Sequence, residues 1–195
     1  MRKASINRET FETQIELSLN LDGEGRAELD FPCGFLTHML TLFARHTGFD
    51  INIKADGDTY VDDHHLAEDL GICLGKAFKE ALGDMKGINR YGSMLLPMDE
   101  ALIETAVDIS GRPYISYKLD IPTDKIGTFD SELIEEFFIS FVRNADITLH
   151  IIQRDGRNSH HIAEGAFKSV ARALRQAVAV DTRFENQIPS TKGVL

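Results

Sequence analysis

The chain contains an internal duplication, so its fold has to accommodate two similar halves. His64-His65-Leu66-Ala67-Glu68 matches His160-His161-Ile162-Ala163-Glu164 at a spacing of 96 residues. Shorter matches follow the same order, pairing Phe11–Thr13 with Ile103–Thr105, Leu29–Pro32 with Leu119–Pro122, Phe43–Arg45 with Phe141–Arg143, and Ile51–Ile53 with Leu149–Ile151. This order predicts a first half over residues 1–92 and a second half over 93–195. Because no obvious linker separates them, we expect one shared core.

Hydrophobic spacing predicts a strand pair, a helix, a strand and a second helix in each half. Apolar residues alternate from Ile15 to Leu21, and Asp22–Gly25 has the composition of a hairpin turn leading into a strand over 26–31. Helices are predicted over 35–45, 64–82, 131–144 and 160–180, and further strands over 51–55, 101–109, 114–119 and 147–152. Helices on one face of a mainly antiparallel sheet, formed twice, give an α+β fold.

The composition is that of an acidic globular chain without a membrane segment. Hydrophobic residues make up 43% of it, and the formal net charge is -10. Such a surface repels nucleic acid and anionic membranes, so neither is expected as a partner, and an anionic substrate would need a local cluster of Arg and Lys. The apolar runs are far shorter than the roughly 20 residues of a membrane span. Because no apolar stretch follows Met1–Ser5 as in a secretory signal, a cytoplasmic location is expected.

The two His-His-x-x-Glu motifs predict metal binding. Seven histidines in 195 residues would give roughly 0.2 His-His pairs by chance, so two pairs with matching glutamates are a specific signal. On a helix, Glu68 can reach the side of His64 or of His65, whereas the two histidines point about 100° apart. Neighbouring histidines are therefore expected to serve different ions, and two such helices brought together could hold two ions.

Two further residues extend the predicted ligand set. His38 is a candidate ligand, and the repeat places Glu136 at the corresponding position of the second half. Nitrogen and oxygen ligands without sulfur favour Mn, Fe or Zn over copper(I) or iron-sulfur chemistry, and Cys33 and Cys73 lack the spacing of a thiolate site. Alternatively, the histidines sit at solvated helix starts capped by Asp62-Asp63 and Asn158-Ser159.

Motifs along nearly the whole chain resemble those of the imidazoleglycerol-phosphate dehydratase family. The matching segments are Arg8-Glu9-Thr10-x-Glu12-Thr13, Phe35–Leu40, Asp62-Asp63-His64-His65-x-x-Glu68-Asp69, Arg90-Tyr91-Gly92, Gly111-Arg112-Pro113, Leu149-His150, Asn158-Ser159-His160-His161-x-x-Glu164 and Pro189–Gly193. The resemblance implies two ribosomal-S5-domain-2-like halves and a hollow homo-oligomer, a 24-mer with octahedral symmetry built from trimers. It also implies two manganese ions per chain, at sites shared between subunits.

The resemblance further implies which residues bind the metal. The ligands carried over are His38, His64, His65, Glu68, Glu136, His160, His161 and Glu164. Repeat symmetry allows His38 and Glu68 to join either His64 with His161 or His65 with His160. Family members often have histidine where this chain has Glu136, so a glutamate ligand there is a departure from the pattern.

The implied reaction dehydrates imidazole glycerol phosphate to imidazole acetol phosphate in histidine biosynthesis, through a metal-stabilised imidazolate. Glu12 or the metal-bound Glu68 and Glu164 would carry the proton, although by ordinary surface statistics Glu12 reads as an exposed strand residue. His38 and His46 would face the substrate, although His46 could instead interact with a helix dipole. The phosphate would be bound by Arg90, Arg112, Lys168, Ser190, Thr191 and Lys192.

Two other functions fit the same residues. Paired metal ions can activate water against a phosphate ester, which would make the protein a di-metal hydrolase. Metal could also act only as an assembly element between subunits, since metal binding can be coupled to association. The released product separates the first alternative from a lyase, because a hydrolase frees inorganic phosphate. Retained assembly without turnover after His65→Ala would argue against the second.

Overall fold

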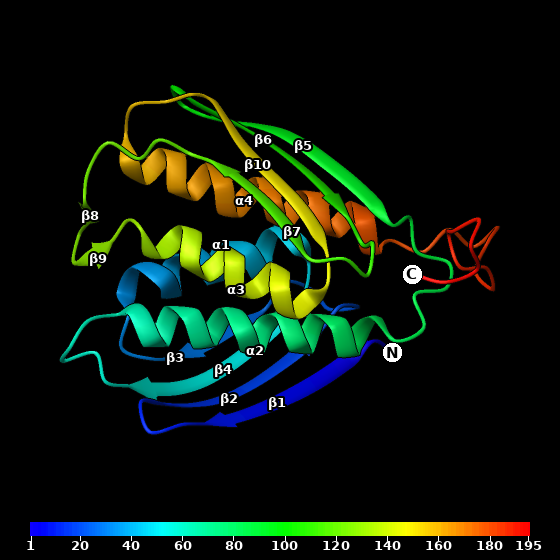
Figure 1. Ribbon diagram of the computed structural model, residues 1–195, viewed down its shortest axis with the longest axis horizontal. Helices are drawn as coiled ribbons and strands as arrows, with labels where there is room; N and C mark the ends of the chain where they lie inside the picture. Colours follow the sequence, from blue (N-terminus) through cyan, green and yellow to red (C-terminus); the bar gives the residue numbers. More distant parts are fainter.

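The computed structural model describes residues 1–195 as two outer β-sheets with two layers of helices between them (Figure 1). The first half contains β1 (Lys3–Glu9), β2 (Thr13–Asn20), β3 (Ala27–Asp30), α1 (Gly34–Thr47), β4 (Asp50–Gly57) and α2 (His64–Leu82). The second half contains β5 (Tyr91–Met98), β6 (Ala101–Asp108), β7 (Tyr114–Lys118), the short β8 (Lys125–Ile126) and β9 (Phe129–Asp130), α3 (Leu133–Ala145), β10 (Thr148–Asp155) and α4 (Ser159–Val178). None of these helices has the length and apolar character needed to cross a bilayer.

The two four-stranded sheets have the same topology, which confirms the predicted duplication and the α+β class. Their strand orders are β1-β2-β4-β3 and β5-β6-β10-β7, and each sheet has one parallel pair among antiparallel ones. In both, the inward side chains of alternate residues pack on helices of the same half. A single hydrophobic cluster of 50 buried residues runs through both halves, so the two halves share one core.

The predicted strand pair within each half is wrong. β2 and β3 are not neighbours, because β4 lies between them, and β10 separates β6 from β7 in the same way. The Asp22–Gly25 turn leads away from β2 instead of closing a hairpin. Asp50 at the start of β4 accepts hydrogen bonds from the backbone N–H groups of Glu24 and Arg26 at 2.9 and 3.1 Å. The turn is therefore held against β4, and β3 becomes parallel to that strand.

The hydrophobic pattern does not predict the first strand of each sheet or the short β8–β9 hairpin. β1 and β5 are edge strands. β5 contains Gly92 and Pro97, which are typical of loops but are tolerated at a sheet edge. A Cβ added at Gly92 would lie 1.9 Å from the carbonyl oxygen of Ala173 in α4, so the glycine permits close packing of strand and helix. β5 begins two residues before the predicted division between residues 92 and 93.

Strand pairing corrects the alignment of the two halves. β4 and β10 begin at Asp50 and Thr148, which are therefore equivalent. Asp50 pairs with Asn20 in β2, and Thr148 pairs with Asp108 in β6. Equivalent residues of β2 and β6 are therefore 88 positions apart in the sequence. The predicted match of Phe11–Thr13 with Ile103–Thr105 is wrong by four residues. That match is based on a Glu-Thr pair present in both segments, whereas the hydrogen-bond register of the sheets determines which residues are equivalent.

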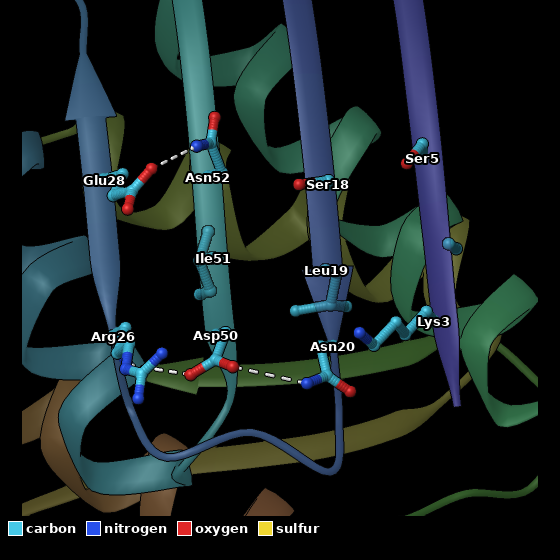
Figure 2. Close-up of a pocket in the computed structure, with 11 residues that line it drawn as sticks. Lys3, Ser5, Ser18, Leu19, Asn20, Arg26, Glu28, Asp50, Ile51 and Asn52 are labelled. Carbon is cyan, nitrogen blue, oxygen red and sulfur yellow. Dashed lines mark hydrogen bonds between the residues drawn. The ribbon is translucent and has the colours of Figure 1, made fainter. Parts of the chain in front are cut away.

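The outer faces of the two sheets differ in character. Side chains that point away from the helices are polar on the first sheet, such as Lys3, Ser18 and Asn52, and they line a depression of about 280 Å³ (Figure 2). No residue predicted to bind metal or substrate lines it. The second sheet instead exposes large apolar side chains on this face, and Leu95 and Tyr114 are 55% and 58% exposed. Duplicated sheets of one topology therefore present two different surfaces.

Helices from the two halves pack directly against each other, α2 on α3 and α1 on α4. The α2–α3 contact is close because α2 presents Gly71 and Gly75. A Cβ at these positions would lie 2.6 Å from the carbonyl oxygen of Phe137 and 2.5 Å from that of Phe141. The backbones of α2 and α3 therefore meet with no side chain of α2 between them at these positions.

Replacing Gly71→Ala is expected to destabilise the protein. The new methyl group would force α2 and α3 apart, at a cost of about 1–3 kcal/mol that exceeds the gain in helix propensity. Thermal unfolding should show a melting temperature lower by several degrees. Gly34→Ala, in a helical position with no atom within 4 Å of the added Cβ, is the matched control. An unchanged melting temperature for Gly71→Ala would contradict this account of the interface.

Candidate metal centre

All four helices begin at the same end of the molecule, together with the β8–β9 hairpin (Figure 1). α2 starts at His64 and α4 at Ser159, so both His-His-x-x-Glu motifs lie in the first turns of helices at this end. Asn158 caps α4 by accepting the backbone N–H groups of His160 and His161, and Asp62 accepts that of His64 at 2.8 Å. The N-cap residue of α2, Asp63, makes no side-chain capping hydrogen bond, whereas α4 is capped as expected of a plain helix start. The histidine side chains also make specific contacts.

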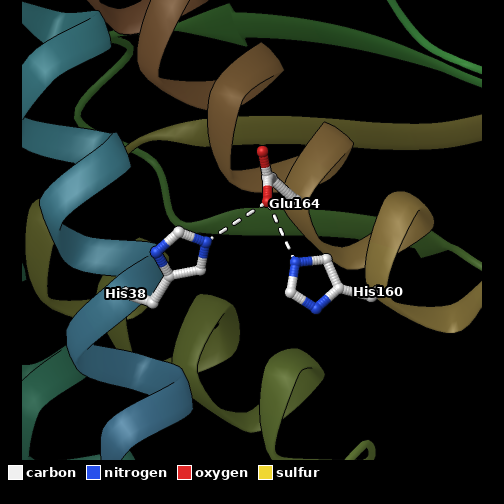
Figure 3. Close-up of side chains that lie close together, drawn as sticks. All are labelled: His38, His160 and Glu164. Atoms are coloured by element: carbon white, nitrogen blue, oxygen red, sulfur yellow. Dashed lines mark hydrogen bonds and ion pairs between the residues drawn. The ribbon is translucent and has the colours of Figure 1, made fainter.

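His38, His160 and Glu164 form a compact cluster (Figure 3). Their donor atoms lie within 4.8 Å of one another. Oε2 of Glu164 is 3.0 Å from Nε2 of His160 and 3.4 Å from Nε2 of His38. His160 and Glu164 share a helix face at i,i+4, and His38 reaches them because α1 packs on α4. Two imidazoles and a carboxylate thus converge on one point.

Lys168 holds the second oxygen of the cluster's carboxylate. Its Nζ lies 2.5 Å from Oε1 of Glu164, one helical turn away, and the Glu164 side chain is only 9% exposed. Burial opposes ionisation of this carboxyl, but hydrogen bonds from Lys168 and His160 outweigh that effect and lower its pKa. Glu164 is therefore an anion with one oxygen neutralised and the other, Oε2, facing the two histidines.

The other histidine of each pair turns toward different carboxylates. Nδ1 of His65 lies 2.9 Å from Oδ2 of Asp58, and Nδ1 of His161 lies 2.7 Å from Oε2 of Glu100. These hydrogen bonds raise the pKa of both histidines. Sequence reasoning missed Asp58 and Glu100. The corrected alignment would have drawn attention to Glu100, because it is the repeat counterpart of Glu12.

The first-half counterpart of the cluster is less compact. By the repeat, it consists of Glu136 on α3 with His64 and Glu68 on α2, and only the second-half group gathers three such donors within 4.8 Å. The sequence allowed His38 to share an ion with Glu68. Within one chain His38 lies beside Glu164, because α1 packs on α4.

Most residues predicted to bind phosphate lie at the opposite end of the molecule. Arg90 donates to Asp108 at 2.7 Å and to the carbonyl oxygen of Pro189 at 3.0 Å. Nη2 of Arg112 lies 3.8 Å from Oδ2 of Asp108. Arg90, Ser190 and Thr191 are among the residues that line a cavity of about 610 Å³. This end carries both chain termini (Figure 1). Lys192 follows in the same C-terminal tail, with its backbone N–H bound to Oγ of Ser190.

Two of the remaining predicted site residues, Lys168 and Glu12, lie at or near the end with the histidine cluster, whereas His46 lies at the far end of α1. Lys168 lies in the cluster, and Glu12, in the turn between β1 and β2, has Oε1 3.7 Å from Nε2 of His65. His46 is in the last turn of α1, where burial, and then the charges of Lys168 and Arg172, lower its pKa. One chain therefore holds its predicted metal-binding residues at one end and most of its predicted phosphate-binding residues at the other.

Comparison with known proteins gives a consistent result. A family model described as imidazoleglycerol-phosphate dehydratase matches residues 32–174. An imidazoleglycerol-phosphate dehydratase of Roseobacter denitrificans is 57% identical over 195 residues, covering 100% of both chains. That of Methylobacterium radiotolerans is 55% identical over 195 residues with the same coverage.

Solved structures agree in fold over nearly the whole chain. The crystal structure of the dehydratase from Staphylococcus aureus has a TM-score of 0.84 and 43% identity, covering 92% of this chain and 99% of that chain. The Pyrococcus furiosus structure, in complex with (S)-C348, has a TM-score of 0.84 and 39% identity, covering 97% and 100%. With this likeness extending over sequence and structure alike, the chain belongs to the imidazoleglycerol-phosphate dehydratase family.

Proposed function

We propose that the protein dehydrates D-erythro-imidazole glycerol phosphate to imidazole acetol phosphate, a hydro-lyase step of histidine biosynthesis. Full-length identity of 57% to a relative of that name supports this function. The observation that carries it chemically is the convergence of His38, His160 and Glu164. A biosynthetic step on a small phosphate also fits the cytoplasmic location expected from the sequence.

The donor set fits a divalent cation. Two imidazole nitrogens and an ionised carboxylate oxygen suit manganese, iron or zinc, and the family resemblance favours manganese. Two ions per chain would use the cluster and its repeat counterpart, His64, Glu68 and Glu136. In this arrangement His65 and His161 are free to bind the ions of a neighbouring chain, because their side chains turn away from the cluster.

A homo-oligomer would complete the site. Within one chain most predicted phosphate-binding residues, Lys168 excepted, and the histidine cluster lie at opposite ends (Figure 1), so these two sets can meet only between subunits. The apolar outer face of the second sheet, with Leu95 and Tyr114 exposed, supplies a surface for a second copy. The 24-mer of trimers implied by the resemblance would bury such a face.

The reaction removes a weakly acidic proton from carbon and expels hydroxide. Divalent ions, when bound to the imidazole nitrogens, would let the ring accept electrons as the proton departs. Glu12 is our candidate for the proton carrier, because its carboxylate is 54% exposed and lies 3.7 Å from Nε2 of His65. Glu68 and Glu164 would instead serve as ligands, with Lys168 fixing the orientation of Glu164. Arg90, Arg112 and the tail of a neighbouring chain would bind the phosphate.

Removal of divalent ions is expected to abolish dehydration and to reduce the mass of the particle. Each ion would join donors from two subunits, so chelation with EDTA should weaken assembly as well as catalysis. Light scattering measures the mass, and the enol of the product in alkali measures turnover. Added manganese should restore both. An active, metal-free particle of unchanged mass would contradict the metal centre, and release of inorganic phosphate would indicate a hydrolase.

Replacing Glu12→Gln is expected to lower kcat by about 10²–10⁴-fold while the manganese content stays unchanged, because a proton carrier is lost but no ligand is. Glu16→Gln, on the polar outer face of the first sheet, is the matched control. Steady-state kinetics with metal analysis checks both variants. If Glu12→Gln retained full kcat, the proton would have to be carried by another group.

Replacing Leu95→Asp is expected to reduce the mass of the particle, because a charge would be buried in the apolar contact between copies. Ser18→Asp places the same charge on the polar outer face of the first sheet and should leave the mass unchanged. Light scattering on both metal-loaded variants measures the effect. A full-size Leu95→Asp particle would show that this face is not part of the assembly.

A further inference from the structure

Each His-His pair has one member whose Nδ1 is bound by a carboxylate outside the cluster. For His65 this is Asp58, at 2.9 Å, and for His161 it is Glu100, at 2.7 Å. The two carboxylates are partly buried, with side chains 15% and 29% exposed. Both contacts are therefore partly shielded from solvent.

The contact determines which ring nitrogen carries the proton. An ionised carboxylate has no proton to donate, so the histidine has to donate from Nδ1. In a neutral ring this leaves Nε2 with a free lone pair. Nε2 of His65 and of His161 points toward exposed carboxylates, Glu12 at 3.7 Å and Asp99 at 3.8 Å. Each ring is thus oriented so that Nε2, the nitrogen that can bind a metal ion, lies at the surface and is accessible to a neighbouring chain.

The two halves make this contact from different loops. Asp58 follows β4, and the residue at the same place after β10 is Gly156, which has no side chain. Glu100 precedes β6, and its repeat counterpart before β2 is Glu12, which faces Nε2 of His65 instead of Nδ1. A contact supplied from different positions is not a remnant of the duplication. This suggests that each half requires the contact for itself.

The contact is also confined to the outward histidines. His160 uses Nε2 toward Glu164 inside the cluster. His64 packs edge-on against the ring of His65 at 6.0 Å between centroids. Neither His64 nor His160 has a carboxylate on Nδ1 among the hydrogen bonds and ion pairs of the structure. A carboxylate therefore contacts Nδ1 only in His65 and His161, the two histidines that lie outside the cluster and could bind an ion of a neighbouring chain.

We propose that Asp58 and Glu100 are positioning residues that fix the tautomer and ring orientation of His65 and His161, so that each presents Nε2 to a metal ion shared with another subunit. This inference rests on the proposed metal-dependent function. It adds to the predicted ligands two carboxylates that do not themselves touch the ion. Each binds Nδ1, the ring nitrogen that faces away from the ion, and so orients the ring and raises the basicity of Nε2. Because the two histidines serve different ions, each carboxylate would support one ion only.

Titration of the metal-free full-length protein with MnCl₂ tests the proposal. The unaltered chain should bind about two ions tightly. Asp58→Asn and Glu100→Gln should each leave one tight ion and weaken the other by about 10–100-fold, since an amide can also donate to Nδ1 and no longer fixes the tautomer. The double variant should weaken both. Calorimetry reports the two affinities separately from catalytic activity.

Matched controls are Asp56→Asn and Glu16→Gln, which remove the same charges from the outer face of the first sheet, where no histidine lies. Their manganese affinity should be unchanged. The melting temperature of the metal-free Asp58→Asn and Glu100→Gln chains should also be unchanged, because a positioning role needs no contribution to folding. Unchanged affinity for both ions, or a loss that follows a lower melting temperature, would overturn the positioning role. An unaltered chain that binds no manganese would overturn the proposed function itself.

Discussion

Packing between helices of opposite halves is the interaction on which the rest of the structure depends. α1 lies on α4 and α2 on α3, so neither half covers its helices without the other. The glycines of α2 allow backbone contact with α3, and the α1–α4 contact brings His38 to Glu164. The buried core and the predicted metal centre therefore arise from the same set of helix contacts. Disturbing a helix interface would move ligands as well as exposing apolar surface.

Much of the fold follows from the sequence because local periodicity reflects burial. The four long helices and the central strands each bury one stripe or one face, and their apolar spacing shows it. The edge strands β1 and β5 were missed because they bury less and because β5 contains Gly92 and Pro97. Strand neighbours could not be inferred either. The insertion of β4 between β2 and β3 depends on tertiary contacts such as those of Asp50, which no local pattern encodes.

The candidate site was predictable in its residue types but not in its grouping. The repeated histidines and glutamates stand out in the sequence, whereas Asp58 and Glu100 do not, because single acidic residues are common in surface turns. Their role depends on loops that fold back over helix starts. A shared Glu-Thr pair also shifted the match between β2 and β6 by four residues, which concealed the correspondence of Glu12 and Glu100. Hydrogen-bond register, available only in three dimensions, removed the error.

The separation of the histidine cluster from most predicted phosphate-binding residues has a genetic consequence. If a complete site combines the histidine cluster of one subunit with the arginines and tail of another, a lesion at either end disables every site in a uniform particle. When two chains with lesions at opposite ends assemble together, some sites receive their cluster from one chain and their tail from the other, and both contributions are intact. Two recessive alleles of this kind would then complement each other within a single gene.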